Sequence, residues 1–265
     1  MINMRRIILF RFHKNPRVCK NRLDILKKLN PDVEIFGYIE NKNKYKKFKR
    51  SLDPYLENVY FIKEKNSYWF WKNGDLATRI WYKNFGINLN FDMLHIIEWD
   101  LLLLKSLDEL YEKIPKDAIG LTALTPLSKV EDRWSWTTKK DHLAEWKKLL
   151  KFVKKEFNYS KKNYASLGPG VCLPKAFLEK FSSVNVPALS NDELRLPLFG
   201  RVFDFRLYDT GFYRKWFNDN EKKFFNCMDK EIEMSKIKKE LSKPLGRRAF
   251  HPFRKIFDIK LLDKK

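Results

Sequence analysis

Two carboxylates, one residue apart, follow an apolar segment near the middle of the chain. Residues 93–97 are apolar except for His95, and the acids are Glu98 and Asp100. Such a run is typical of a strand that is buried on both faces, as in a parallel sheet. Ligands bind at the carboxyl ends of strands in open α/β sheets, and buried carboxylates need a compensating charge. The pattern therefore predicts a bound cation at Glu98 and Asp100.

A second pair of acids lies where a helix is expected to begin. Asp192 and Glu193 follow the cap-forming residue Asn191, and acids in a first helical turn ordinarily stabilise the helix dipole. Asp75 could similarly cap a helix that extends to about Phe85. Helix formation alone can therefore explain the acids at both positions.

The elements around these residues begin with a strand over residues 6–12, a helix over about 18–29 and a second strand over 33–39. This is a βαβ unit, which nearly always crosses over with a right hand. It contains no G-x-G-x-x-G and no Walker A sequence, so a dinucleotide-binding Rossmann enzyme and a P-loop kinase are disfavoured. Further elements are expected at residues 59–62 (strand), 75–85 (helix), 118–124 (strand), 141–157 (helix), 171–173 (strand, with Pro174 at helix position N1), 202–208 (strand) and 222–241 (helix).

Composition favours a globular protein with one substantial core. The chain has 265 residues, of which 44% are hydrophobic and 15% aromatic. Its net charge of +22 predicts anionic partners, although a lysine-rich coding bias produces the same excess. The three cysteines lie far apart, and neither a signal-peptide pattern nor an apolar run of about 18 residues is present. These features predict a soluble, cytoplasmic protein without disulfides.

The triplet Glu98, Trp99 and Asp100 is followed by a second apolar run and by a helix start with a capping box at Ser106 and Glu109. This arrangement resembles the DXD region of GT-A glycosyltransferases. The resemblance implies an α/β fold: a single GT-A-like (Rossmann-like) domain over residues 1–265, with a mixed, mostly parallel central sheet flanked by helices. It also implies a nucleotide-binding half, about residues 1–112, and an acceptor half, about residues 113–265.

The segment of residues 246–255 resembles the late histidine and basic segment of the same family. The resemblance implies that His251 completes a metal site with Glu98 and Asp100, with Glu98 nearer the ribose or a metal-bound water. Mn²⁺ or Mg²⁺ would be the ion, and Mn²⁺ accepts a mixed carboxylate and imidazole set more readily. The residues implied to contact the nucleotide-diphosphate sugar are Asp75, Arg79, Glu98, Asp100, Arg247, Arg248 and Lys255.

Asp192 and Glu193 resemble the acidic motif that supplies the catalytic base in inverting members of the family, although the order of the acids is reversed here. If the reaction inverts, the resemblance implies that one of them removes the acceptor proton, with Asp192 the favoured candidate; the alternative role is to orient the acceptor. The turn at Gly168 and Gly170 resembles the segment that faces the donor sugar and the acceptor.

Two aromatic groups of residues could contact a ligand. Trp134 and Trp136 lie in an expected loop over residues 126–138, and Tyr68 to Trp71 are aromatic throughout. Aromatic faces suit sugar rings and nucleotide bases. Packing in the core is the default alternative for both groups.

Together these features predict a metal-dependent glycosyltransferase that moves a sugar from a nucleotide-diphosphate sugar to a glycan, lipid-linked or protein-linked hydroxyl. No specific nucleic-acid partner is expected, and a lipid-linked acceptor would bring peripheral contact with the cytosolic membrane face. One alternative is a nucleotidyltransferase of related fold, although residues 11–20 lack the expected glycine-rich signature. Another is a non-catalytic protein that binds nucleic acid or a membrane surface, which explains the +22 charge but not the placement of the acids.

Overall fold

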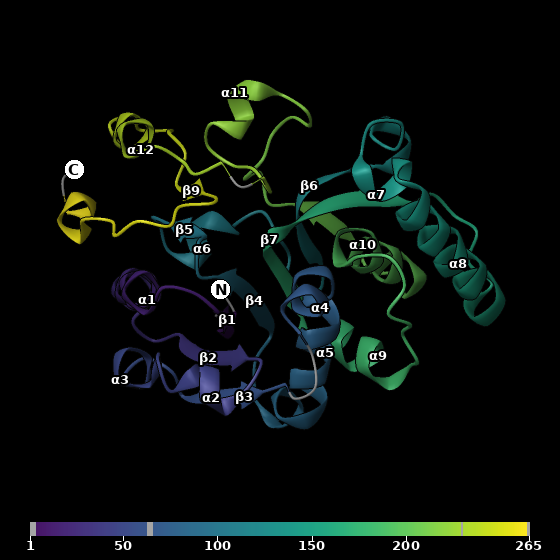
Figure 1. The fold of residues 1–265 in the computed structure, drawn as a ribbon, viewed down its shortest axis with the longest axis horizontal. Coiled ribbons are helices and arrows are strands. Elements are labelled where there is room, and N and C mark those ends of the chain that lie inside the picture. Colours follow the sequence, from purple (N-terminus) through teal and green to yellow (C-terminus); the bar gives the residue numbers. More distant parts are fainter. Residues whose placement is uncertain (1–3, 63–65, 229, 264–265) are drawn as a thin grey trace.

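The computed structural model describes residues 4–62, 66–228 and 230–263. Its centre is a seven-stranded sheet in the order β3-β2-β1-β4-β7-β6-β8 (Figure 1). The strands are β1 (Arg6–Arg11), β2 (Glu34–Ile39), β3 (Asn58–Phe61), β4 (Met93–Glu98), β6 (Ile119–Pro126), β7 (Tyr164–Pro174) and β8 (Leu207–Asp209). β7 pairs antiparallel with β4 and β6, and the other neighbours pair in parallel. The predicted α/β class and mixed, mostly parallel sheet are therefore confirmed.

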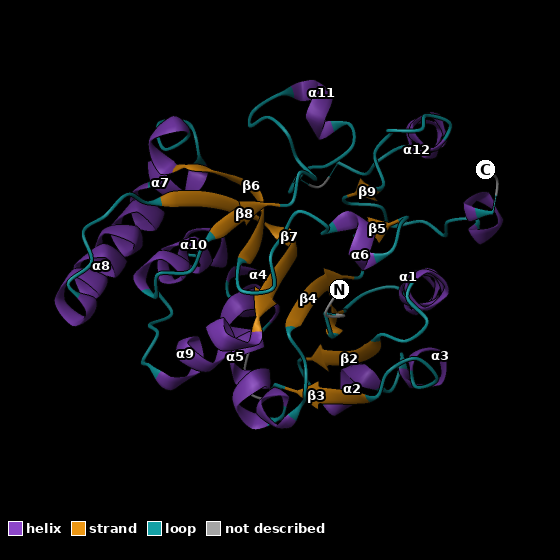
Figure 2. Ribbon diagram, turned by 180° about the vertical axis from the view of Figure 1, so that it is seen from behind, coloured by secondary structure: helices purple, strands orange, loops and turns teal. Residues whose placement is uncertain are grey.

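Helices cover both faces of this sheet (Figure 2). They are α1 (Pro16–Leu29), α2 (Lys42–Tyr45), α3 (Lys49–Leu52), α4 (Ser67–Lys72), α5 (Gly74–Asn84), α6 (Leu107–Leu110), α7 (Ser135–Thr138), α8 (Lys140–Phe157), α9 (Lys175–Ser183), α10 (Asp192–Val202), α11 (Asp219–Lys222) and α12 (Met234–Leu241). Alternate residues of β1 enter different apolar clusters. Ile7 and Leu9 pack with α5, α8, α9 and α10, whereas Ile8 and Phe10 pack with α1 and α3. Burial on both faces explains the continuous apolar runs of the parallel strands.

The first βαβ unit forms as the sequence predicts. Asn15 precedes α1 and its side chain accepts a hydrogen bond from Val18 N, while Pro16 occupies the first helical turn, where a missing N–H is tolerated. At the other end of α1, Asn30 Nδ2 donates to Leu26 O. The capping box of Ser106 at the start of α6 is also present, as the sequence predicted, whereas α1 begins at Pro16, two residues before its predicted start.

Three expected elements differ from the structure. β7 extends over eleven residues rather than residues 171–173, and Pro174 is the N-cap of α9 rather than its N1 residue. α10 continues to Val202, so the strand expected at 202–208 is reduced to β8. A single helix was expected over residues 222–241. Among the described residues of this range, only residue 222, at the end of α11, and the residues of α12 are in an α-helix. The intervening segment includes Asn226, whose backbone pairs with His251. Long-range backbone pairing overrides helical periodicity in that segment.

The C-terminal segment returns to the centre of the molecule through a small second sheet. β5 (Leu102–Leu103) pairs antiparallel with β9 (Ala249–Phe250). The chain then continues along α1, where Arg22 Nη2 donates to the Lys255 backbone oxygen at 2.9 Å (Figure 1). No helix within the described residues is both long and apolar enough to cross a membrane. The division into nucleotide and acceptor halves stays a prediction.

Candidate functional site

Glu98, Asp100 and His251 converge at the carboxyl end of β4. Glu98 is the last residue of that strand, and Asp100 lies in the turn that leads to β5. His251 Nε2 lies 3.5 Å from Asp100 Oδ1 and 3.8 Å from Glu98 Oε2. One ligand atom of each residue lies within 4.8 Å of the others. The structure thus brings together the three residues that the sequence predicted as metal ligands.

The pairing of β5 with β9 places His251 beside the acids. Phe250 pairs with Leu102, so the residue that follows it lies level with the acidic turn. Phe253 N donates to Asp100 O at 2.8 Å and fixes the segment on its far side. His251 Nδ1 lies 2.6 Å from the backbone oxygen of Asn226, which can only accept, so Nδ1 carries a proton. Nε2 is therefore the atom available to a proton or a metal ion.

Each of the two carboxylates also contacts an arginine. Arg11 Nη1 donates to Glu98 Oε1 at 3.0 Å, and Arg254 Nε donates to Asp100 Oδ2 at 3.2 Å. The parallel register of β1 and β4 sets Arg11 beside Glu98. One oxygen of each acid is therefore held by an arginine, while the other lies toward His251 Nε2.

The charges at this site favour a cation between the three side chains. Burial opposes ionisation of Asp100, but hydrogen bonds and charge from His251 and Arg254 hold the pKa of this carboxyl well below its usual range. Burial also disfavours the imidazolium form of His251, but the hydrogen bond and charge of Asp100 outweigh it and raise the pKa of the ring. The carboxylates therefore stabilise positive charge at Nε2.

The donor set also suits a divalent metal ion. Two carboxylates and one imidazole match the mixed ligands that Mn²⁺ accepts, whereas Mg²⁺ prefers an all-oxygen shell. The Nδ1 contact of His251 with a backbone carbonyl is the outer interaction that commonly orients metal-binding histidines. Glu98, Asp100 and His251 therefore fit Mn²⁺ better than Mg²⁺.

The second acid pair opens α10 and differs in how its oxygens are used. Asp192 Oδ2 accepts from Gly74 N at 3.1 Å, and within the described parts of the chain Oδ1 makes no hydrogen bond. Glu193 Oε1 accepts from Gly168 N at 3.0 Å, and its Oε2 accepts from Trp136 Nε1 at 2.9 Å and from Asn191 Nδ2 at 3.2 Å. Asp192 thus keeps an oxygen available to a substrate, whereas Glu193 is held in place by protein donors.

Both acids are harder to ionise than usual. Burial, followed by the charges of Asp75 and Glu193, raises the pKa of Asp192 well above its ordinary value. Burial raises the pKa of Glu193 to about 7, against the opposing hydrogen bonds from Gly168 and Trp136. Carboxylates with raised pKa values are common at catalytic positions.

Gly74 allows Asp192 and Arg11 to approach each other. A Cβ atom at Gly74 would lie 2.8 Å from Asp192 Oδ2 and 2.9 Å from Arg11 Nη1. α4, which precedes Gly74, also binds Arg11, through the backbone oxygen of Phe70. Arg11 therefore links the acid pair at α10 to Glu98.

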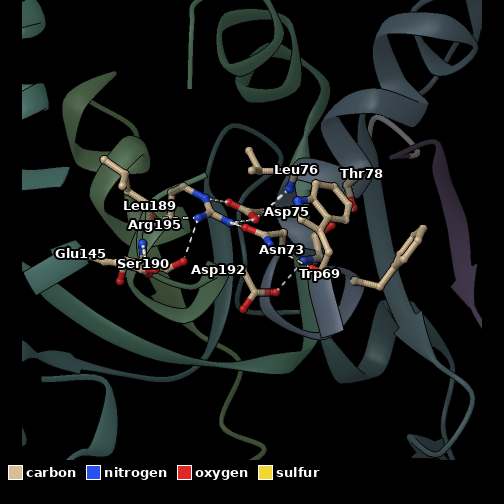
Figure 3. A network of polar contacts seen from close by, with 12 residues as sticks. Trp69, Asn73, Asp75, Leu76, Thr78, Glu145, Leu189, Ser190, Asp192 and Arg195 are labelled. Carbon is tan, nitrogen blue, oxygen red and sulfur yellow. Dashed lines mark hydrogen bonds and ion pairs between the residues drawn. The ribbon is translucent and has the colours of Figure 1, made fainter. Parts of the chain in front are cut away.

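Arg195 fixes the first turn of α10 from inside the protein (Figure 3). Its Nε donates to Asp75 Oδ2 at 2.7 Å, and its Nη2 donates to Asp75 Oδ1 at 2.5 Å and to Asn73 Oδ1 at 2.9 Å. Its Nη1 donates to the backbone oxygens of Leu189 at 2.9 Å and Ser190 at 3.2 Å. The five N–H groups of the guanidinium are thus matched by five acceptors. The network joins the start of α10 to the start of α5.

This network accounts for Asp75 in structural terms. Arg195 donates to both carboxylate oxygens of Asp75, and neither side chain is exposed. Asp75 also lies in the first turn of α5, behind the N-cap residue Asn73, so its expected capping position was wrong by two residues. Arg79 donates to the backbone oxygens of Phe181 at 2.8 Å and Val184 at 2.5 Å. Contact of Asp75 and Arg79 with a nucleotide stays a prediction that these contacts do not favour.

The three predicted diphosphate ligands of the C-terminal segment have different surroundings. Arg247 Nη2 donates to Glu221 Oε1 at 2.6 Å, and Arg248 Nη1 donates to the backbone oxygen of Glu240 at 2.9 Å. Lys255 is exposed. Arg247 and Arg248 therefore hold the segment together.

Three arginines of the site were missed in the sequence. Arg11 and Arg254 contact the acidic turn, and Arg195 orders α10. The signal available for Arg11 was its place at the end of the first strand, where ligands of α/β sheets bind. Nothing local distinguishes Arg195 from a surface arginine, because its partners are distant in sequence.

The aromatic residues are also arranged differently from the expectation. Trp134 and Trp136 are each only 7% exposed, in or beside the short helix α7 instead of in an open loop, so the packing alternative is correct for them. Tyr68 and Trp71 are 59% and 58% exposed on α4. Gly170 has the positive φ of +82° that its glycine permits.

Comparison with known proteins gives a distant likeness of fold. No protein-family model and no curated protein sequence matches the chain. The chain is similar to the solved galactosyltransferase LgtC in complex with donor and acceptor sugar analogs, with 15% identity, a TM-score of 0.38, and coverage of 68% of this chain and 60% of that one. An active-site mutant of LgtC gives 14% identity, a TM-score of 0.42 and coverage of 77% and 72%. A cytidylyltransferase from Leptospira borgpetersenii serovar Hardjo-bovis has 10% identity and a TM-score of 0.42, and the match covers 78% of this chain and 76% of that one. Likeness at this level assigns no activity.

Proposed function

We propose that the protein is a metal-dependent glycosyltransferase that moves a sugar from a nucleotide-diphosphate sugar to a hydroxyl acceptor. The observation that carries the proposal is the convergence of Glu98, Asp100 and His251 within 4.8 Å at a strand end. Asp192, on the adjoining helix start, keeps one carboxylate oxygen available. A metal site beside a carboxylate with a free oxygen provides both groups that such a transfer requires.

In this proposal the C-terminal segment receives the donor diphosphate. Glu98, Asp100 and His251 would hold Mn²⁺ or Mg²⁺, which supplies neutralising charge to the diphosphate oxygens when bound. Lys255, exposed on the same segment, adds positive charge where the leaving group develops negative charge. Arg247 and Arg248 support this segment through their contacts with Glu221 and Glu240.

The acceptor lies on the Asp192 side of the site. Asp192 Oδ1 takes the proton of the acceptor hydroxyl as the acceptor oxygen bonds to the anomeric carbon. The bond from that carbon to the diphosphate oxygen breaks, and the diphosphate leaves with the electron pair. Glu193 positions Asp192 because three protein donors hold its own carboxylate. Direct displacement with one base implies inversion at the anomeric carbon.

The first test is ligand-dependent thermal stability. UDP, GDP, CDP and TDP are each added with and without Mn²⁺, and one of them is expected to raise the melting temperature only when the metal is present. A ligand at a hundred times its Kd stabilises the native state by about 2.7 kcal/mol. Asp100→Asn should abolish this response, whereas Asp117→Asn, an aspartate whose side chain is 66% exposed, should retain it. Stabilisation by generic polyanions alone would contradict the proposal, and release of pyrophosphate during turnover would indicate nucleotidyl transfer instead.

A further inference from the structure

A row of four aromatic rings runs inward from the surface of α4, and its third ring, Trp136, contacts Glu193. The ring centroids of Tyr68 and Trp71 are 5.7 Å apart, those of Trp71 and Trp136 are 5.3 Å apart, and those of Trp136 and His142 are 4.3 Å apart. The planes of neighbouring rings are tilted by 33° to 38°. The rings therefore form a continuous packed row contributed by α4, α7 and α8, with Tyr68 and Trp71 at its exposed end.

The two outer rings of the row, Tyr68 and Trp71, are exposed to solvent. Tyr68 and Trp71 stand three residues apart on α4, so they share one face of the helix. Tyr68 is 59% and Trp71 is 58% exposed. Burying a large aromatic side chain contributes strongly to the free energy of folding or binding. Two neighbouring rings that stay exposed in the folded protein therefore mark a surface that can bind a ligand.

This surface is joined to the proposed catalytic carboxylates. Trp136, against which Trp71 packs, donates from Nε1 to Glu193 Oε2 at 2.9 Å. Phe70, beside Trp71 on α4, accepts from Arg11 through its backbone oxygen. Gly74, immediately beyond α4, donates its N–H to Asp192. The short segment that presents the rings therefore also binds the residues that surround the reacting hydroxyl.

We propose that Tyr68 and Trp71 form an acceptor subsite that binds the pyranose rings of a glycan; this inference rests on the proposed function. A pyranose has an apolar face of C–H groups, which matches an aromatic ring, and hydroxyls at its edge, which suit the nearby carboxylates. Two exposed rings are too small a surface for a protein partner, because stable protein interfaces bury about 800 Å² on each side. The donor diphosphate is placed at the other end of the site, by Lys255 and the metal ligands.

The arrangement also predicts a preference for more than one sugar. Trp71 lies nearer to Glu193 through Trp136, and Tyr68 lies one ring further away. A terminal sugar with its hydroxyl at Asp192 would have the next ring of the chain on Trp71, and Tyr68 would carry the ring beyond. Oligosaccharides should therefore bind better than the corresponding monosaccharides.

The test measures binding of sugars independently of turnover. Maltose, cellobiose, lactose and chitobiose are screened by saturation-transfer NMR, in which the C–H protons of the bound face should receive the strongest transfer. Trp71→Ala is expected to weaken the disaccharide that binds best by about tenfold, and Tyr68→Ala by a smaller factor. Leu245→Ala serves as the matched control, because Leu245 is 95% exposed on a different segment, and it should bind as the unmodified protein does. Once an acceptor is known, Trp71→Ala should raise its KM about tenfold, with a change below about twofold in the Kd of the nucleotide diphosphate.

Each outcome separates the two proposals. Loss of disaccharide binding in Trp71→Ala, with metal-dependent nucleotide binding retained, supports the subsite. Equal binding by the two proteins, or no binding of any disaccharide to the unmodified protein, overturns it even if nucleotide-dependent transfer is observed. Weaker nucleotide binding in Trp71→Ala overturns it as well, because the rings would then bind a base. Disaccharide binding without any response to nucleotides would instead refute the proposed transferase function.

Discussion

Arg195→Met should destabilise the protein strongly, because the substitution leaves a carboxylate without its counter-charge in the interior. The side chains of Arg195 and Asp75 are both 0% exposed, and two hydrogen bonds of 2.5 and 2.7 Å join them. Methionine has a similar length but supplies no donor to Asp75, to Asn73 or to the backbone oxygens that Arg195 now binds. Breaking a buried ion pair by removing one partner costs about 3–5 kcal/mol.

The loss should be measured as a free energy of unfolding. Urea titration followed by tryptophan fluorescence gives this quantity, and the melting temperature should fall by on the order of 10 °C. Arg206→Met provides the matched control. Arg206 also contacts both oxygens of an aspartate, Asp117, but the side chains are 57% and 66% exposed, so its loss should cost less than about 1 kcal/mol.

A double-mutant cycle isolates the contribution of the pair. Arg195→Met leaves the charge of Asp75 unpaired in the interior, and Asp75→Asn removes that charge. The double variant should therefore recover a large part of the lost stability. The coupling energy should be about 2 kcal/mol or more, because the two side chains are in direct contact. An equal loss of unfolding free energy in Arg195→Met and Arg206→Met would refute the reasoning, because burial would then have no effect on how much an ion pair contributes to stability.

Two further predictions concern the acid pair. Because burial raises the pKa of Glu193 from 4.5 to about 7, the folded protein retains a proton that the unfolded chain loses between these pH values, so stability should fall by about 3 kcal/mol as pH rises through that window. The raised pKa of Asp192 acts in the same direction. Urea titrations at several pH values across the window should show that the free energy of unfolding falls less steeply with pH in Glu193→Gln than in the unmodified protein. An equally steep fall in the variant would contradict the assignment. Gly74→Ala should displace the tips of Asp192 and Arg11 and lower kcat by about a hundredfold, while the free energy of unfolding changes by less than about 1 kcal/mol. Unchanged kcat in the alanine variant would show that the two side chains can move without consequence.

The sequence predicted those parts of the fold that depend on local patterns. The apolar run that forms β1 and the capping box at Ser106 are short-range features, and each is present in the structure. β7 was underestimated because Gly168, Pro169 and Gly170 interrupt its pattern, although the strand continues through them. Residues 202–208 alternate like a strand, yet the first of them completes α10. Local periodicity therefore located elements better than it located their ends.

The site was predicted in part for a related reason. Glu98 and Asp100 stand out because acids at a strand end are unusual, and the proximity of His251 to them was expected from family resemblance. Arg11 and Arg254 reach the acids through strand register and through a contact 154 residues apart, neither of which a local pattern contains. Charged residues are frequent in this chain, so their type alone does not single them out.

The return of the C-terminal segment to β5 has a consequence for the protein during its synthesis. Asp100 and Arg254 are separated by 154 residues, and a ribosome adds about 5–20 residues per second. The acidic turn therefore emerges on the order of ten seconds before the guanidinium and the imidazole that neutralise it. Throughout that interval the nascent chain can form β1, β2 and β4 but not the complete cluster. Any catalysis by this site must therefore begin after Arg254 has been added to the chain.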